Sequence, residues 1–484
     1  MIRTKPGRWS WTTLALVLVL AACGPAPAPR VVRVTPAGGA VGARLDRPIV
    51  VEFSSPLDPA SVRPDAVELT VGGAALAYTV QLGGGGTRLL VRITEQPEAL
   101  PATAEARLLG ALRGRNGRSV EPYAWSFELG DWIPMGGALN RDPANNVRSL
   151  SLAWWNGPAV VWGEADDPDE NNFTVYAARW DDAAEVWEPL GERLDLAPTT
   201  LCDYPSAAVL SGELWAAMQC SVRGRMRVYA AHWNGDAWER FGPLNHDADR
   251  WAFVPQLAAG DRLYALWREW DTQANTVTLV WSSYQTDWTP GSPDLASGTD
   301  LSLSSFAASG QAMAAAYHDN NGPGGVPVYR YDGQAWQQLG PGPLEADGRA
   351  NTHSQRARLA FTPAGQLWAA WDEGGRSYAA RWDGHAWQLL AEPAGGGLGS
   401  SSYTHDLDAA SGSPCVLLTE GPDQDLYVRC WDGAAWRGYG GRITVDPGNA
   451  ALLSDEAGWP LVAWRAEEEG SWRLHVACYN HVAP

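Results

Sequence analysis

Lysine is nearly absent from this chain of 484 residues, since Lys5 is the only one. Positive charge is scarce overall: 36 Lys and Arg stand against 55 Asp and Glu, for a formal net charge of −19. A chain with no further lysine cannot use Schiff-base chemistry or a Walker A phosphate loop. The negative charge would repel a phosphate backbone, so no nucleic-acid partner is expected.

Long apolar stretches are also missing, and the apolar run at residues 11–20 is too short to span a bilayer. Three cations precede this run, as in a secretory signal. It ends in Leu20-Ala-Ala-Cys23-Gly, which resembles the lipobox of bacterial lipoproteins. The resemblance implies a signal peptide at residues 1–22, a lipidated Cys23 and a Pro/Ala linker at residues 23–30. It places the protein in the cell envelope, lipid-anchored to the outer membrane of a two-membraned bacterium or to the outer face of a single membrane.

Five cysteines follow Cys23, and an exported chain is free to form disulfides. Cys415 and Cys430 flank a Gly-Pro-Asp turn and are expected to face each other across a hairpin. Cys202 and Cys220 are the other local candidates, which leaves Cys478 unpaired. No Cys-x-x-Cys or Cys/His spacing indicates a metal site.

Residues 31–129 show short alternating apolar runs separated by Gly and Pro turns, a pattern typical of a β-sandwich. The motifs Thr35-Pro36, Phe53-Ser-Ser-Pro and Tyr123-Ala-Trp125 resemble the bacterial Ig-like domains of S-layer and surface proteins. The antibody pattern of Cys, Trp and Cys is missing, so the resemblance implies only the architecture and a spacer role.

Tryptophan is over-represented, with 27 residues against 7 Phe, because a Trp-bearing unit recurs through residues 130–484. Clear copies are Trp233-Asn-Gly-Asp-Ala-Trp238 and Trp382-Asp-Gly-His-Ala-Trp387. The second aromatic of each unit recurs about every 50 residues, which with four short strands per unit predicts a β-propeller. These residues are Trp132, Trp187, Trp238, Trp288, Trp336, Trp387 and Trp436.

The seven copies predict seven blades, and the phase of the repeat predicts how the ring closes. The last copy stops after its third strand, near Tyr479, whereas residues 131–137 resemble an orphan fourth strand. Pairing the two would complete the seventh blade as a velcro closure and remove an exposed sheet edge. The unit is similar to Trp-Asp-Gly propellers of secreted bacterial proteins. The predicted fold is therefore all-β, an Ig-like sandwich followed by a seven-bladed propeller.

Function is expected where the copies differ, because the shared residues build the ring. The variable loops are rich in Asp and Glu and are expected to form a negative rim around the central channel. With aromatics and a few cations they would suit a glycan or a peptide, although an ordinary solvated surface has the same composition. The candidate ligand-binding residues are Trp251, Trp270, His318, Asp319, Arg356, Asp372, Glu373 and His405.

One loop segment is dense in oxygen ligands and is a candidate Ca²⁺ site, although it lacks the order of an EF-hand. It comprises Asp166, Asp167, Asp169 and Glu170. No other cofactor is expected.

These patterns favour a lipid-anchored, non-catalytic surface protein whose propeller binds a glycan, a peptide or an envelope protein. An envelope-assembly scaffold and a glycan-active enzyme with paired rim carboxylates are the alternatives. The enzyme class therefore stays open, and no catalytic residue is assigned. The membrane is a partner through the lipid anchor, and a monomer is expected.

Overall fold

The computed structural model describes residues 27–166, 172–194, 201–322, 324–346, 355–390, 393–395 and 401–482. Within them the chain is built of strands, with only three short 3-10 turns at Pro59–Ser61, Pro64–Ala66 and Gly84–Gly86. The predicted all-β class is confirmed. No helix in this part of the chain is long and apolar enough to cross a membrane. The predicted signal peptide and Cys23 lie outside the described residues.

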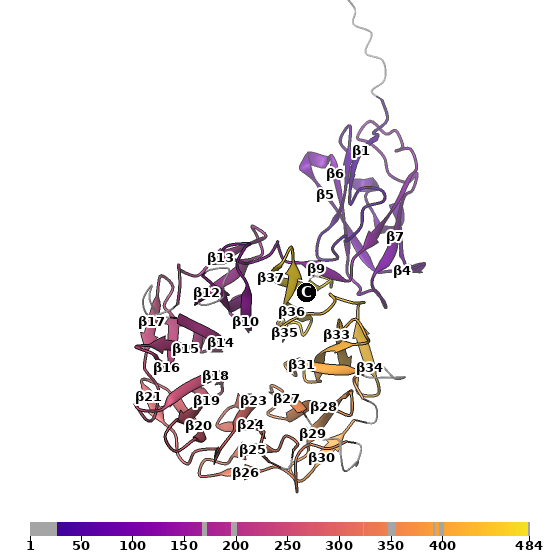
Figure 1. Ribbon diagram of the computed structural model, residues 1–484. Coiled ribbons are helices and arrows are strands. Elements are labelled where there is room, and N and C mark those ends of the chain that lie inside the picture. The colour runs from indigo at the N-terminus through magenta and orange to yellow at the C-terminus, as the bar shows by residue number, and fades with distance from the viewer. Residues whose placement is uncertain are drawn as a thin grey trace, which may run out of the picture.

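The N-terminal domain consists of two four-stranded antiparallel sheets around one core (Figure 1). The first sheet has the order β1 (Val31–Thr35), β2 (Ile49–Phe53), β6 (Arg88–Ile93) and β5 (Tyr78–Gly83). The second has the order β4 (Ala74–Ala75), β3 (Val67–Val71), β7 (Ala102–Leu108) and β8 (Tyr123–Leu129). Alternation along β6 and β7 places every second residue in the core, as expected for strands with one buried face.

Seven further sheets stand in a ring around a central axis (Figure 1). In six of these sheets the first strand in chain order lies innermost and the fourth outermost, whereas in the last sheet β35 lies innermost and β9 outermost. The sheets are β10 (Val147–Trp154), β11 (Pro158–Ala165), β12 (Phe173–Asp181), β13 (Val186–Pro189); β14 (Leu201–Leu210), β15 (Glu213–Val222), β16 (Arg225–Trp233), β17 (Trp238–Phe241); β18 (Trp251–Ala259), β19 (Leu263–Asp271), β20 (Thr276–Tyr284), β21 (Trp288–Pro290), with β22 (Ala296–Gly298) pairing β20; β23 (Leu301–Ser309), β24 (Ala312–Asp319), β25 (Val328–Tyr331), β26 (Trp336–Gln338); β27 (Gln355–Phe361), β28 (Leu367–Glu373), β29 (Arg376–Trp382), β30 (Trp387–Leu389); β31 (Ser402–Asp408), β32 (Cys415–Glu420), β33 (Asp425–Trp431), β34 (Trp436–Tyr439); and β35 (Ala450–Ser454), β36 (Pro460–Glu468), β37 (Ser471–Tyr479), β9 (Trp132–Pro134).

The last sheet contains the two ends of the ring, because β9 pairs antiparallel with β37. Ile133 lies opposite Cys478, and Met135 donates its N–H to the carbonyl of Val476 at 2.8 Å. The outermost strand of this sheet is therefore contributed by residues that precede the ring in sequence. This pairing covers an edge of β37 that would otherwise be open.

Small residues allow neighbouring sheets to pack closely in the ring wall. The second strands β11 and β28 are buried along their whole length, so both faces are covered by adjacent sheets. Alanines in the second strands of other sheets have no exposed surface either, such as Ala216 on β15 and Ala315 on β24. The same holds for Ala370 on β28. A larger side chain at such a position would have to displace the adjacent sheet.

The repeated tryptophans pack across the outer hairpin, as the sequence predicted. Trp382 and Trp387 lie opposite each other with ring centroids 5.4 Å apart. Asp383 accepts the N–H groups of His385 and Ala386, and Gly384 has φ 103°, so the Asp-Gly pair builds the turn. The Nε1 of Trp387 donates to the carbonyl of Leu339 in the preceding sheet. Trp187 and Trp238 make the same bond to Met135 and Leu190, so the repeat joins several of the sheets to their neighbours.

Both predicted disulfides are present. Cys202–Cys220 joins β14 to β15, and Cys415–Cys430 joins β32 to β33. Cys478 is free, as expected. Two disulfides fit an extracellular or envelope compartment.

Candidate functional site

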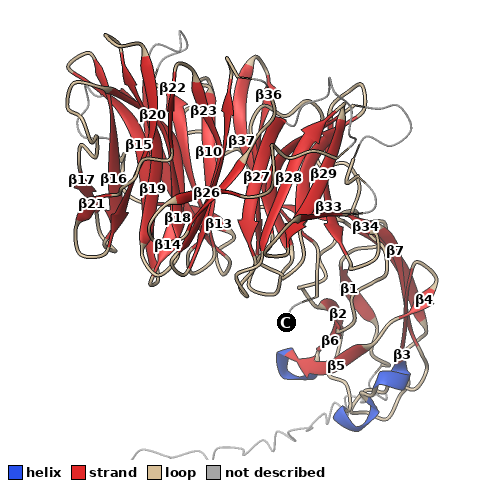
Figure 2. Ribbon diagram, turned by 90° about the horizontal axis from the view of Figure 1, so that it is seen from below, coloured by secondary structure: helices blue, strands red, loops and turns tan. Residues whose placement is uncertain are grey.

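The N-terminal domain is attached to one face of the ring, which we call the docked face (Figure 2). Asn480, just beyond β37, is buried and makes three hydrogen bonds to the N-terminal domain and to Gly130, which connects that domain to β9. Its Oδ1 accepts the N–H of Leu45 at 2.8 Å, and its Nδ2 donates to the carbonyls of Ala43 and Gly130 at 2.9 and 2.8 Å. The C-terminal strand of the ring and the N-terminal domain are therefore directly bonded.

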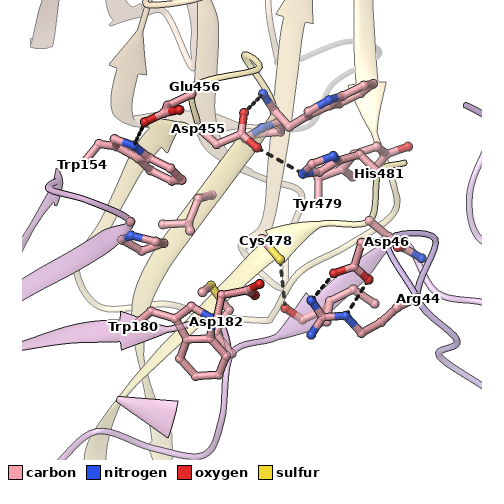
Figure 3. Close-up of a pocket in the computed structure, with 18 of the residues that line it drawn as sticks. Arg44, Asp46, Trp154, Trp180, Asp182, Asp455, Glu456, Cys478, Tyr479 and His481 are labelled. Atoms are coloured by element: carbon pink, nitrogen blue, oxygen red, sulfur yellow. Dashed lines mark hydrogen bonds and ion pairs between the residues drawn. The ribbon is translucent and has the colours of Figure 1, made fainter. Parts of the chain in front are cut away.

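A pocket of about 480 Å³ lies at this junction (Figure 3). The N-terminal domain contributes Arg44 and Asp46, and the first and last sheets of the ring contribute the remaining walls. Its polar and aromatic lining residues include Arg44, Asp46, Trp154, Asn156, Trp180, Asp182, Asp455, Glu456, Trp459, Tyr479 and His481. A volume in this range is typical of small-molecule sites, which occur preferentially between domains.

Aromatic rings form the apolar part of the pocket. The Trp459 ring stacks on His481, with centroids 5.3 Å apart and planes 9° apart, and on Tyr479 at 5.8 Å. Trp154, the last residue of β10, is half-buried, and its Nε1–H donates a hydrogen bond to Glu456 at 3.1 Å. These contacts fix the orientation of both indoles before any ligand binds.

An ion pair holds the imidazole of this stack. His481 Nε2 lies 3.1 Å from Asp455 Oδ2, and Asp455 also accepts the N–H groups of Ala457 and Trp459. Burial disfavours the charged imidazole, but the hydrogen bond to Asp455 outweighs it and raises the pKa of His481. Burial likewise opposes the charged carboxylate, yet His481 and the Trp459 N–H lower the pKa of Asp455.

Other polar groups remain available in the same pocket. Asp182 and Asn156 are exposed, and Asp182 has no hydrogen-bond or ion-pair partner among the described residues. Arg44 is instead committed to Asp46, through contacts of 2.9 and 2.6 Å. Carboxylates and an amide beside indole rings can accept hydroxyl hydrogens while the rings cover an apolar C–H surface.

Cys478 also lines the pocket, but its thiol is not activated as a nucleophile. Burial raises the pKa of its thiol to about 11, so it stays protonated at neutral pH. Because the thiolate is the nucleophile, the site offers no cysteine nucleophile.

The residues predicted from the sequence lie on the opposite face of the ring, where the second strands end. Trp251 and Trp270 lie directly opposite each other on β18 and β19, with ring centroids 6.4 Å apart. Arg356 and His318 line a separate cavity at the channel. His405 Nε2 lies 3.3 Å from Thr419 Oγ1, and burial together with Arg358 and Arg356 lowers its pKa to about 4.

The expectation of an exposed acidic rim needs correction at several positions. Glu373 is buried and accepts N–H groups from Trp371 Nε1 and the backbone of Ala346. Asp372 is also buried, where it accepts the N–H of Thr404 at 2.6 Å, and burial raises its pKa to about 6. Asp319 accepts the N–H of Asn321 in a turn. These carboxylates are engaged in hydrogen bonds within the protein.

The predicted calcium segment lies mostly outside the described residues, which include neither Asp167, Asp169 nor Glu170. Asp166 is exposed and accepts the hydroxyl of Thr174 at 2.7 Å. In the described part of the chain, no three His, Cys, Asp or Glu residues are grouped so as to hold a metal. The calcium site therefore stays a prediction.

Sequence reasoning missed the interdomain pocket because its walls come from segments far apart in the chain. The residues around Asp455 and Trp459 form an ordinary turn in the repeat, and Arg44 lies in the segment expected to be a spacer. The sequence feature that could have indicated the pocket is the pair of adjacent tryptophans, Trp154 and Trp155, at the end of an innermost strand.

The chain matches no established protein family and no curated protein. Solved structures with partial similarity include an α-L-arabinanase of Penicillium chrysogenum, at 14% identity and TM-score 0.40 over 59% of this chain and 94% of that chain. A sialidase of Trypanosoma rangeli has 12% identity and TM-score 0.38, over 57% of this chain and 54% of that chain. A lectin of Aleuria aurantia has 11% identity and TM-score 0.38, over 62% and 96%. Similarity at this level carries no conclusion about function.

Proposed function

We propose that this protein is a lipid-anchored, non-catalytic binding protein of the bacterial cell envelope that holds an uncharged glycan in the pocket between its two parts. In this proposal the N-terminal part is an Ig-like domain and the ring is a seven-bladed β-propeller closed by β9. The two four-stranded sheets and the ring of sheets support these assignments. The lipobox-like Leu20–Gly24 segment supports the anchor, and the disulfides fit the compartment.

The observation that carries the proposal is the composition of the interdomain pocket. Trp154 and Trp459 are oriented by hydrogen bonds and ring stacking. Glu456 lies beside Trp154, and Asp182 lies beside Trp180 in the same pocket (Figure 3). A sugar ring has an apolar C–H face and a rim of hydroxyl donors, so it matches both kinds of group. Because the pocket has more acids than bases, an uncharged sugar is favoured over an acidic one.

A glycan array on the exported chain, followed by titration calorimetry on each hit, tests the proposal. Trp154→Ala should weaken binding about five- to tenfold, since it removes one stacked ring and one pocket wall. Trp155→Ala is the matched control: this adjacent half-buried indole donates to Gly212 and does not line the pocket. Both variants should keep the wild-type circular dichroism spectrum.

A blank array with a folded protein would count against the proposal, as would equal losses from the two tryptophan variants. Repeating the titration with a chelator tests the calcium prediction separately. Weaker binding or a lower melting temperature under chelation would support a bound cation, and unchanged values would count against it.

A further inference from the structure

A second cavity, of about 470 Å³, lies in the channel of the ring and has the opposite electrostatic character. Three consecutive innermost strands and the end of β24 form it, away from the docked face. Its lining residues are Gln256, Leu303, Ser304, His318, Arg356 and Arg358. No carboxylate is among them, although acids outnumber bases in the chain. We call this cavity the channel pocket.

Arg358 is fixed by the backbone of the ring wall. Its Nε donates to the carbonyl of His405 at 2.7 Å, and its Nη1 donates to the carbonyls of Ser304 and Ala357 at 3.2 Å. The side chain thereby bridges β23, β27 and β31. Its Nη2 has no hydrogen-bond partner among the described residues, which leaves a rigid donor beside the cavity.

Arg356 is placed at the cavity by an irregularity in β27. The pairing register with β28 shifts between Gln355 and Arg358, and Arg356 has φ 47°, in the left-handed region. Tyr204 and Val254 have the same left-handed conformation at the corresponding irregularities of β14 and β18, so this bulge is a recurrent feature of the innermost strands that here places an arginine at the cavity. The exposed guanidinium lies over the Tyr403 ring, 4.7 Å from its centroid.

Neither arginine forms a close ion pair with a carboxylate in the described part of the chain. No Asp or Glu oxygen there lies within 4.0 Å of the nitrogens of Arg356 or Arg358. The nearby acids are engaged elsewhere: Asp372 accepts the N–H of Thr404, and Asp406 accepts those of Leu407 and Leu452. Asp372 and Asp406 lie near enough to interact electrostatically with these arginines, but among the described residues the cavity itself is lined by two guanidinium groups and no carboxylate.

We propose that the channel pocket binds an acidic sugar through its carboxylate, with Arg356 and Arg358 as the charged donors. A planar guanidinium matches a carboxylate in geometry as well as in charge. Gln256 and Ser304 supply amide and hydroxyl groups for the sugar hydroxyls, and the volume is in the range of small-molecule sites. This site is separate from the interdomain pocket and takes a ligand of different charge.

The test compares D-glucuronate with D-glucose, which lacks the carboxylate, by titration calorimetry or saturation-transfer NMR on the full chain. Glucuronate should bind at least about tenfold more tightly than glucose at this site, and high salt should remove that difference. Arg356→Gln should weaken glucuronate binding about tenfold. Arg381→Gln is the matched control, because Arg381 is an exposed arginine of the same sheet on β29.

Trp154→Ala, at the interdomain pocket, should leave glucuronate binding unchanged, so failure of one site is distinguishable from failure of the other. Equal affinity for glucuronate and glucose would overturn the proposal. Equal losses from the two arginine variants would also overturn it. A glutamate-rich peptide that binds while glucuronate does not would assign the channel pocket to an acidic peptide instead. Arg358→Gln requires a check of thermal stability, since it also removes backbone hydrogen bonds.

Discussion

A buried glutamate two residues after a buried tryptophan recurs in three sheets of the ring. Glu164, Glu269 and Glu373 lie at or near the ends of the second strands, and each accepts the indole N–H of the tryptophan two residues before it. Each also accepts backbone N–H groups from the loop that enters the innermost strand of its own sheet. These carboxylates hold the entry loops in place, which explains why acids that seemed to form a rim are buried.

Glu269→Gln tests this loop-holding role. Glutamine keeps the size of the side chain but turns an amide NH₂ toward N–H groups of His246, Asp247 or Trp267, so hydrogen bonds to a buried group are lost. The free energy of unfolding should fall by about 1–3 kcal/mol in urea denaturation. Glu467→Gln, at an exposed position, should change it by less than about 0.5 kcal/mol. Equal effects would contradict the assigned role.

Buried acids also make stability depend on pH. Burial raises the pKa of Asp406 to about 6, above the value of about 3.9 expected in the unfolded chain. The folded state then binds the proton more tightly, so the free energy of unfolding should fall as pH rises from about 4 to about 6. His405 opposes this trend, because its lowered pKa of about 4 favours the folded state as pH rises over the same range.

Asp406→Asn isolates the contribution of that carboxyl group. From pH 4.5 to pH 7.5, the free energy of unfolding should fall by up to about 2 kcal/mol less in the variant than in the wild type. Urea denaturation at both pH values measures this difference. Asp432 is the control, because hydrogen bonds from Ala435 and Arg437 lower its pKa to about 2, below the tested range. Asp432→Asn should therefore keep the wild-type dependence of the free energy of unfolding on pH. The wild-type dependence in Asp406→Asn as well would refute the contribution assigned to Asp406.

At the scale of elements, the residue that follows the fourth strand bonds back to the third strand in several sheets. Met135 and Leu339 are equivalent: both are buried, and both donate their N–H to the third strand at 2.8 Å. Of these two bonds, that of Met135 joins residues more than three hundred positions apart, whereas that of Leu339 is local. The same backbone hydrogen bond therefore closes the ring at Met135 and stabilises a local hairpin at Leu339.

Comparing Met135→Pro with Leu339→Pro distinguishes the role in ring closure from the role in a local hairpin. Each proline removes one ladder hydrogen bond. Met135→Pro should raise hydrogen exchange throughout the first and last sheets, because it loosens the contact that closes the ring. Leu339→Pro should raise exchange only around β25 and β26. Local protection changes of the same extent in both variants would contradict a closing role for β9.

At the scale of the whole molecule, the N-terminal domain is part of the candidate site as well as a neighbour of the ring. Asn480 bonds to Leu45, Ala43 and Gly130, and Gln96 bonds to the backbone of Asn480 and Val482. These contacts set the position of Arg44 and Asp46 in the interdomain pocket. Glycan affinity should therefore depend on domain attachment.

Asn480→Ala tests this dependence. Removing the buried amide should loosen the attachment, increase the radius of gyration in small-angle scattering and weaken glycan binding several-fold. Glucuronate binding at the channel pocket should stay unchanged. Asn320→Ala, an exposed position on the opposite face, should leave both binding reactions and the scattering profile unchanged. Wild-type glycan affinity in Asn480→Ala would show that the interdomain pocket does not need fixed domains.

Local patterns in the chain were sufficient for much of the architecture. The spacing of Trp233 and Trp238, the Asp-Gly turns and the alternation of apolar residues predicted strands and hairpins, because these depend on neighbours close in sequence. The Cys415–Cys430 pairing followed for the same reason, since the two residues lie at either side of one turn.

The sequence by itself therefore determined the strand class, the repeating unit and the disulfides of this protein. Only the tertiary structure decided which polar residues are available to a ligand. Glu373 and Arg356 are equally hydrophilic in the sequence, yet packing buries the first against a backbone loop and leaves the second exposed at the channel. The interdomain pocket arose only where residues 44–46 meet residues 455–481, because contact between segments so far apart is set by how whole sheets and domains pack.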